Sequence, residues 1–169
     1  MDKQVADLMK DQVNKEFYSA YLYLDISNYY YEKNLDGFGH WFMLQAKEEQ
    51  QHALKILKYL QDNNEKVKLE TIPAPEFNFT NLREPLVATL KHEQYVTGLI
   101  HAISKKARES DDFRSYQFME WFVAEQGEEE KNTSDLIAKY DLFGDDPKGL
   151  YLLNNELGGR TETAEAATA

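Results

Sequence analysis

Apolar side chains recur every three or four residues over four long stretches of the chain, which is the repeat of an amphipathic helix. The stretches run from about Asp2 to Tyr31, from Asp36 to the segment DNNEK (62–66), from Asn81 to Arg108 and from Asp111 to Tyr140. A shorter stretch from Pro147 to Leu157 predicts a fifth helix. Strand-type alternation with paired turn signals is absent from the sequence. We therefore predict an all-α fold.

The lengths of the links between these helices predict how they pack. The first and third links are short, so helices one and two, and helices three and four, are expected to form antiparallel hairpins. The second link, VKLETIPAPEFNFT, is long enough to run the length of the bundle, which makes helices two and three parallel. We predict a four-helix bundle with a long crossover and a short fifth helix, over residues 1–157. The polar residues 158–169 are expected to be a disordered tail.

Acidic and amide side chains interrupt the apolar face of each long helix. Glu49 shares its helical face with Phe42, Ala53 and Ile56, and His52 follows one turn later. Glu49 is therefore predicted to point into the core. The same periodicity places further polar side chains on the inner faces of the other three helices: Glu16, Glu93, Gln126 and Glu129.

These inward polar groups lie near the middle of their helices, so packing brings them to one level. A buried, ionised and unpaired carboxylate costs several kcal/mol, and clustering several of them adds repulsion. The inner faces offer no Lys or Arg to neutralise Glu16, Glu49 and Glu93. A pair of divalent metal ions between the helices would compensate their charge. The alternative is that each polar group is hydrogen-bonded locally in a metal-free structural bundle.

Composition narrows the function classes. The net charge is −11, which disfavours nucleic acid binding through the bulk field, and the absence of Cys excludes disulfides and thiolate metal sites. No apolar run reaches the roughly 18 residues of a membrane span, and the first residues contain no apolar segment typical of a secretion signal. A soluble cytoplasmic protein is expected.

The donor set also narrows the metal. Carboxylate and imidazole without sulfur suit iron, manganese or zinc. Di-iron helical bundles use one Glu from each of two helices and a Glu-x-x-His motif from each of the other two. Here Glu16 and Glu93 are the single carboxylates and Glu49-x-x-His52 is one complete motif, whereas the fourth helix offers Gln126-x-x-Glu129. One tight and one loose site favour a metal that enters, reacts and leaves.

Four stretches carry a specific resemblance: EFYSAYLYL around Glu16, QAKEEQQHA around Glu49 and His52, KHEQ around Glu93, and WFVAEQGEEE around Gln126. Over residues 3–157 the chain resembles a bacterial non-haem ferritin. The resemblance implies iron storage in a cage of twenty-four subunits, with a ferroxidase centre that oxidises Fe²⁺ with dioxygen or peroxide. It implies that Glu16, Glu49 and His52 hold the first iron. It further implies that Glu49 bridges to a second iron at Glu93, with Gln126 or Glu129 nearby.

The resemblance also implies a third iron site, formed by Glu48, Glu125, Glu128 and Glu129. Tyr23 corresponds to a tyrosine beside the centre and is expected to supply an electron; the alternative is a hydrogen-bonded core residue. For Glu48, Glu125 and Glu128 the alternative is a solvated helix edge. Haem is not expected, because Gln50 stands where the haem-containing relatives have Met, and Glu129 stands where they have a second His.

One competing function is a stand-alone di-metal oxidase or peroxidase of the rubrerythrin type. It is disfavoured because the chain lacks a Cys-rich module and the second Glu-x-x-His motif.

Overall fold

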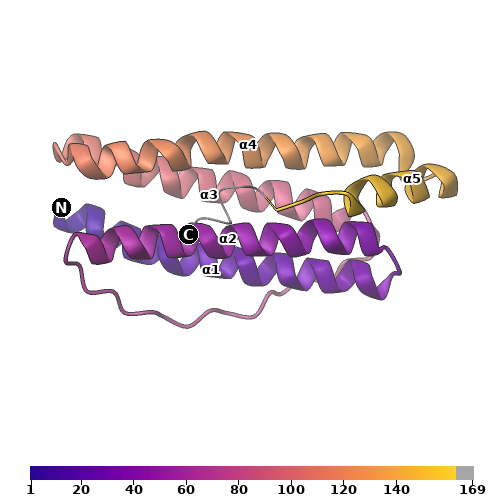
Figure 1. Cartoon of the computed structure of the whole chain (residues 1–169), viewed down its shortest axis with the longest axis horizontal. Helices are drawn as coiled ribbons and strands as arrows, with labels where there is room; N and C mark the ends of the chain where they lie inside the picture. The colour runs from indigo at the N-terminus through magenta and orange to yellow at the C-terminus, as the bar shows by residue number, and fades with distance from the viewer. Residues whose placement is uncertain (163–169) are drawn as a thin grey trace.

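The computed structural model describes residues 1–162. Within this range the chain forms five helices and no strand: α1 (Lys3–Glu32), α2 (Asp36–Asp62), α3 (Glu84–Glu109), α4 (Phe113–Phe143) and α5 (Pro147–Gly158) (Figure 1). The prediction of an all-α fold with five helices is confirmed, and most helix ends lie within three residues of those predicted. None of the described helices combines the length and apolarity that crossing a membrane requires.

The crossover is also confirmed. The link between α2 and α3 runs along the bundle from one end to the other, so α2 and α3 point the same way while α1 and α4 run opposite to them (Figure 1). Asn14 on α1 donates a hydrogen bond to the backbone oxygen of Thr71 in this link, at 3.2 Å. The crossover places the carboxylates of α2 and α3 in the same bundle interior without a tight turn between the two helices.

Three helices end with the same backbone conformation and hydrogen bond. Asn34, Asn64 and Asp111 adopt left-handed backbone conformations, with φ of 57°, 61° and 54°. The residue after each of them donates to a carbonyl five residues back, as in Leu35 N to Tyr30 O at 3.0 Å. This is the Schellman arrangement, which satisfies the last carbonyls of a helix and turns the chain sharply. It fixes the two hairpin turns and the exit into the crossover.

The start of α3 differs from the prediction. The helix begins at Glu84 rather than near Asn81, and Asn81 Oδ1 accepts from the backbone nitrogens of Arg83 and Glu84, at 3.0 and 3.1 Å. The Glu84 carboxylate reaches back to Thr80 and Asn81: the Thr80 backbone nitrogen donates to it at 2.6 Å, and Asn81 Nδ2 donates to it at 2.9 Å. Asn81 and Glu84 therefore form a reciprocal capping arrangement just before the helix, and Pro85 lies in its first turn, where its missing N–H costs nothing.

Helix α5 completes the amino end of α2, which has no side-chain cap of its own. Asn154 Oδ1 accepts from the backbone nitrogens of Gly37 and Phe38, at 2.9 and 3.2 Å. A Cβ at Gly37 would lie 1.7 Å from the backbone oxygen of Asn154, so glycine is needed for this approach. After α5, the chain continues over α2. Residues 163–169 of the tail expected to be disordered lie outside the described residues.

The core consists of two apolar clusters, one toward each end of the bundle. One cluster contains Val5, Val13 and Ile100, and the other contains Tyr30 and Phe38. Between them lie the buried polar side chains that the sequence places at mid-helix. This level contains Glu16, Glu49, His52, Glu93, Gln126 and Glu129, each at most 5 % exposed.

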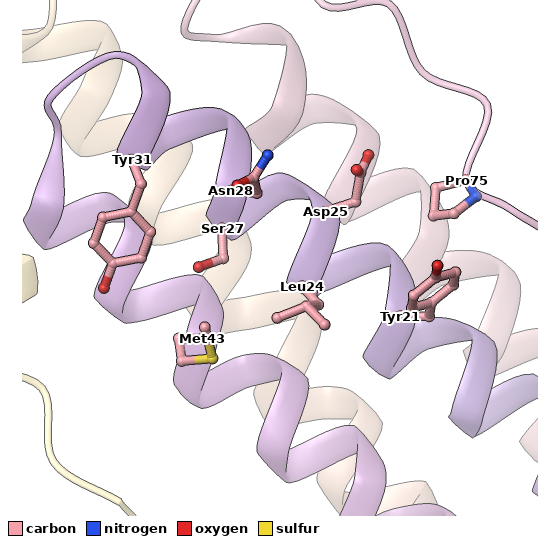
Figure 2. A pocket seen from close by; sticks show the side chains of 8 residues that line it. All are labelled: Tyr21, Leu24, Asp25, Ser27, Asn28, Tyr31, Met43 and Pro75. Atoms are coloured by element: carbon pink, nitrogen blue, oxygen red, sulfur yellow. The ribbon is translucent and has the colours of Figure 1, made fainter.

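The outer face of α1 and α2 is partly apolar. Tyr21, Leu24 and Tyr31 on α1 are 41–48 % exposed. Together with Met43 of α2 and Pro75 of the crossover they line a shallow hollow of about 330 Å³ (Figure 2). A neighbouring hollow is lined by further apolar residues of the same two helices and by Ile72 of the crossover. This face is separate from the polar level inside the bundle.

Candidate metal centre

The first donor group joins α1 and α2. Glu49 and His52 are three residues apart, which places both on one face of α2, and Glu16 faces them from α1. Each offers a ligand atom, and these atoms lie within 4.8 Å of one another. His52 Nδ1 is 3.4 Å from Glu49 Oε2. The two helices of one hairpin therefore supply two carboxylates and one imidazole to a single point.

The second donor group crosses the bundle. Glu49 of α2, Glu93 of α3 and Glu129 of α4 bring ligand oxygens within 4.8 Å of one another. All three side chains are buried, at 1–4 % exposed. Glu49 belongs to both groups, so one carboxylate is available to each of them.

A third group opens toward the surface. His52, Glu125 and Glu129 also place ligand atoms within 4.8 Å of one another, and His52 Nε2 is 3.8 Å from Glu125 Oε1. The Glu125 side chain is 26 % exposed, so this group connects the buried centre with solvent on the α4 side.

Neutral donors orient the carboxylates. Gln12 Nε2 donates to Glu16 Oε1 at 2.9 Å and Gln45 Nε2 donates to Glu129 Oε2 at 2.5 Å. The remaining contacts converge on Glu93, which accepts from the Tyr23 hydroxyl and, at 3.0 Å, from Gln126 Nε2.

Burial makes ionisation of these acids costly. Burial, followed by repulsion from Glu93 and Glu16, raises the pKa of Glu49 well above its usual range. Burial and the charges of Glu49 and Glu93 do the same to the pKa of Glu129. Burial raises the pKa of Glu93 to about 7, opposed by the hydrogen bonds from Tyr23 and Gln126. Burial also raises the pKa of Glu16. Cations between these groups would reverse the shifts, because an adjacent positive charge favours the ionised carboxylate.

The residues fit a pair of metal ions. Among the described residues, four buried side-chain oxygens lack a hydrogen-bond partner, and two of these, Glu16 Oε2 and Glu49 Oε1, face each other across the first donor group. Buried polar atoms are rarely left unpaired, and each costs roughly 1–3 kcal/mol when it is. Both atoms belong to donor groups, so coordination would satisfy them. The oxygen and imidazole donors suit iron, manganese or zinc.

The other residues expected from the sequence occupy different surroundings. Gln126 directs its amide nitrogen to Glu93 and to the Glu93 backbone oxygen. Glu48 is 8 % exposed and is bound by Arg160, and Glu128 is exposed on α4. The structure therefore brings Glu125 and Glu129 of the expected third site together at His52, and neither Glu48 nor Glu128 belongs to a donor group found among residues 1–162.

Gln12, Gln45 and Arg160 are contacts of the centre that sequence reasoning missed. A signal for the first two exists, since Gln12 precedes Glu16 by four residues and Gln45 precedes Glu49 by four, on the same helical faces. Arg160 follows α5 in a segment expected to be disordered, so periodicity carries no signal for it.

Comparison with known proteins gives one consistent result. The ferritin-like domain model matches residues 6–143. A bacterial non-heme ferritin of Campylobacter jejuni is 37 % identical over 90 % of this chain and 91 % of its own length. A probable bacterial non-heme ferritin-like protein of Haemophilus influenzae is 34 % identical over 97 % of this chain and 99 % of its own length.

The solved structures agree. An open-pore ferritin from the archaeon Archaeoglobus fulgidus superposes with a TM-score of 0.92 at 34 % identity, over 95 % of this chain and 98 % of that one. An engineered closed form of that ferritin superposes with a TM-score of 0.93 at 34 % identity, over 96 % and 99 %. The match of the family model to most of the chain, together with these relatives, shows that the chain belongs to the ferritin-like family and resembles its bacterial non-haem ferritins.

Proposed function

We propose that this protein stores iron and oxidises Fe²⁺ at the centre between its four long helices. The observation that carries the proposal is the convergence of four buried carboxylates and one imidazole in two donor groups that share Glu49, with no Lys or Arg in either group. The relatives named as ferritins support iron as the substrate.

The two halves of the centre are chemically unequal. Glu16, Glu49 and His52 would bind the first Fe²⁺ through two carboxylates and an imidazole. Glu49, Glu93 and Glu129 would bind the second through carboxylates, with Gln126 holding Glu93 in place. The second site has no imidazole among its donors, so it is expected to release its product more readily. This asymmetry suits a centre through which iron passes on its way to storage.

The overall reaction balances without another reductant. Each of two Fe²⁺ ions loses one electron, and dioxygen takes up both electrons and two protons to give hydrogen peroxide; peroxide can then serve as an oxidant for further Fe²⁺. Tyr23 lies beside the second site, with its hydroxyl donating to Glu93. We propose that Tyr23 serves when dioxygen is reduced fully to two water molecules: three Fe²⁺ ions and Tyr23 then supply the four electrons, the tyrosine releases its hydroxyl proton, and a later Fe²⁺ reduces the oxidised tyrosine again. Trp121 also lies close, with its ring centroid 5.5 Å from that of His52.

A third iron would bind on the route between the centre and the surface of α4. Glu125 and Glu129 support this site, because both lie within ligand distance of His52. Glu128 could join from the exposed face of α4, and Glu48 would have to leave Arg160 to do so.

The proposal includes assembly into a homo-oligomer, in the form of a twenty-four-subunit cage. Its support in this chain is the apolar outer face of α1 and α2, where Tyr21, Leu24 and Tyr31 are substantially exposed around a hollow (Figure 2). Contact with a second copy would cover this face and leave the bundle interior unchanged.

Size-exclusion chromatography before and after aerobic addition of Fe²⁺ tests the proposal. A particle near half a megadalton that retains hundreds of irons supports storage. A small oligomer that retains two irons per subunit would instead indicate a stand-alone oxidase. A protein that takes up no iron would be a structural bundle.

Two variants test whether iron oxidation depends on the residues of the centre. The double variant Glu49→Ala with His52→Ala is expected to lose fast oxidation while still assembling. Glu120→Gln, on the exposed side of α4, is the control and is expected to oxidise iron as the wild type does. Unchanged oxidation in the double variant would place the reaction elsewhere.

A further inference from the structure

Arg160 contacts α2 at the outer edge of the centre. Its Nη1 donates to Gln45 Oε1 at 2.9 Å and to the Trp41 backbone oxygen at 3.2 Å, and its Nη2 donates to the carboxylate of Glu48. The guanidinium carbon lies 4.5 Å from the centroid of the Trp41 ring. The side chain is 19 % exposed, although the residue follows the last helix. Such a set of contacts holds the guanidinium in one place.

The contact with Gln45 determines which way its amide points. Gln45 is 1 % exposed, and its side chain has one accepting and one donating end. Because Oε1 accepts from Arg160, Nε2 faces the opposite direction and donates to Glu129 Oε2. If the amide rotated by half a turn, its oxygen would face and repel the oxygen of Glu129 in the ionised form that binds a metal.

Glu129 is the residue on which this orientation acts. It is the α4 carboxylate of the second donor group and also belongs to the group with His52 and Glu125. A donor on Oε2 directs the carboxylate and leaves its other oxygen to face the cluster. The relay therefore runs from Arg160 through Gln45 to a residue that the proposed function assigns to the second metal.

We propose that Arg160 is a positioning residue for the second metal site, acting through the amide of Gln45 on Glu129. The inference rests on the proposed function, because it needs Glu129 to be a ligand. Arginine suits the role because its planar fork serves Gln45 and Glu48 from different nitrogens, whereas a lysine ammonium presents one nitrogen to both. Gln45 also hydrogen-bonds Glu49, which both sites share, whereas Glu129 is a donor of the second site and not of the first, so we expect the larger effect at the second site.

Titration of the metal-free, assembled protein with Co²⁺ alone tests the inference, with the visible absorption of bound Co²⁺ and calorimetry reporting each binding step. In Arg160→Ala we expect the first Co²⁺ to bind within twofold of wild type and the second about tenfold more weakly, the usual effect of losing a partner that orients a ligand. Glu162→Ala is the matched control, since it removes the neighbouring tail contact to Lys47 and is expected to change neither step.

A double variant identifies the route. If Arg160 acts through Gln45, then Arg160→Ala adds nothing to the weakening of the second step already caused by Gln45→Ala. Arg160→Lys keeps the charge and lacks the fork, and we expect it to leave the second step weak.

Four results would overturn the inference: an unweakened second step in Arg160→Ala, equal weakening of both steps in that variant, further weakening in the double variant, or full recovery in Arg160→Lys. Elution volume and unfolding temperature of each variant confirm that the assembly is intact. A wild-type protein that binds fewer than two Co²⁺ per subunit would refute the proposed function itself, whereas two tight ions in both wild type and Arg160→Ala would refute this inference and leave the function standing.

Discussion

Replacing Glu93 with Gln should make the metal-free protein more stable while weakening its second metal site. Burial raises the pKa of Glu93 from 4.5 to about 7. The folded protein therefore holds this proton to higher pH than the unfolded chain does, so stability falls as pH rises from 4.5 through about 7. Above pH 7 the full penalty is present, and it amounts to about 3 kcal/mol per subunit.

The Glu93→Gln substitution removes the titratable carboxyl and with it the penalty for its charge. The new amide lowers the free energy of unfolding by a smaller amount. Tyr23 can still donate to the new amide oxygen, whereas Gln126 must rotate its own amide to accept from the new nitrogen. One disturbed hydrogen bond costs about 1 kcal/mol. The variant should thus be about 2 kcal/mol more stable than wild type at pH 8, and about 1 kcal/mol less stable at pH 4.5.

Guanidinium unfolding of the metal-free proteins at a fixed subunit concentration, from pH 4.5 to 8, measures this difference. Glu120→Gln, an exposed change on α4, should show no such pH dependence relative to wild type. Calorimetry with Co²⁺ on the same samples should show the first ion retained and the second weakened. A Glu93→Gln variant that is equally destabilised at pH 4.5 and pH 8 would refute the reasoning, because Glu93 would then carry no penalty for its charge.

Three further outcomes are expected. Gly127→Ala should stabilise α4 by about 1 kcal/mol in thermal unfolding, because an added Cβ meets nothing within 4 Å and alanine is the better helix former. Burial, followed by the charge of Lys15, lowers the pKa of His92 to about 4, so the unfolded chain binds a proton more readily and stability falls as pH falls from 6.5 through 4. His92→Gln should therefore lose less stability than wild type over that range in acid unfolding. Tyr23→Phe removes a hydrogen bond that lowers the pKa of Glu93, so the pH midpoint for binding of a second Zn²⁺ should move upward in calorimetric titrations. A midpoint that stays in place would show that this hydrogen bond does not act on Glu93.

Periodicity was sufficient to predict the bundle and the level of its acidic residues. Glu16, Glu49 and Glu93 each lie on an apolar face at mid-helix, and a face of that kind has one direction in which to pack. The long second link then permits one arrangement in which these faces meet. The burial of these three side chains can therefore be predicted from the residues of each helix alone.

The contacts around the candidate ligands join residues that are far apart in the sequence. Arg160 lies 115 positions from Gln45, and Gln45 lies 84 positions from Glu129. The periodicity of one helix cannot predict such pairs, because they depend on how α2 and α4 pack and on where the chain runs after α5. α3 similarly begins at Glu84 rather than near Asn81, because Asn81 accepts from the backbone nitrogens of Arg83 and Glu84 as a cap before the helix. Local patterns predict which face of a helix is buried. The residues that contact that face from other parts of the chain are known only from the three-dimensional structure.

The division of the bundle into two hairpins bears on how the chain folds. The donors Glu16, Glu49 and His52 all belong to the α1–α2 hairpin, whereas Glu93 and Glu129 belong to the α3–α4 hairpin. Each hairpin forms from contacts that are close in sequence, so it is expected to form early. Docking of one hairpin onto the other then brings like charges together at the final step. Divalent ions in the surrounding solution should accelerate that docking and slow the reverse separation, and they should also stabilise the α1–α2 hairpin, because one donor group lies entirely within it.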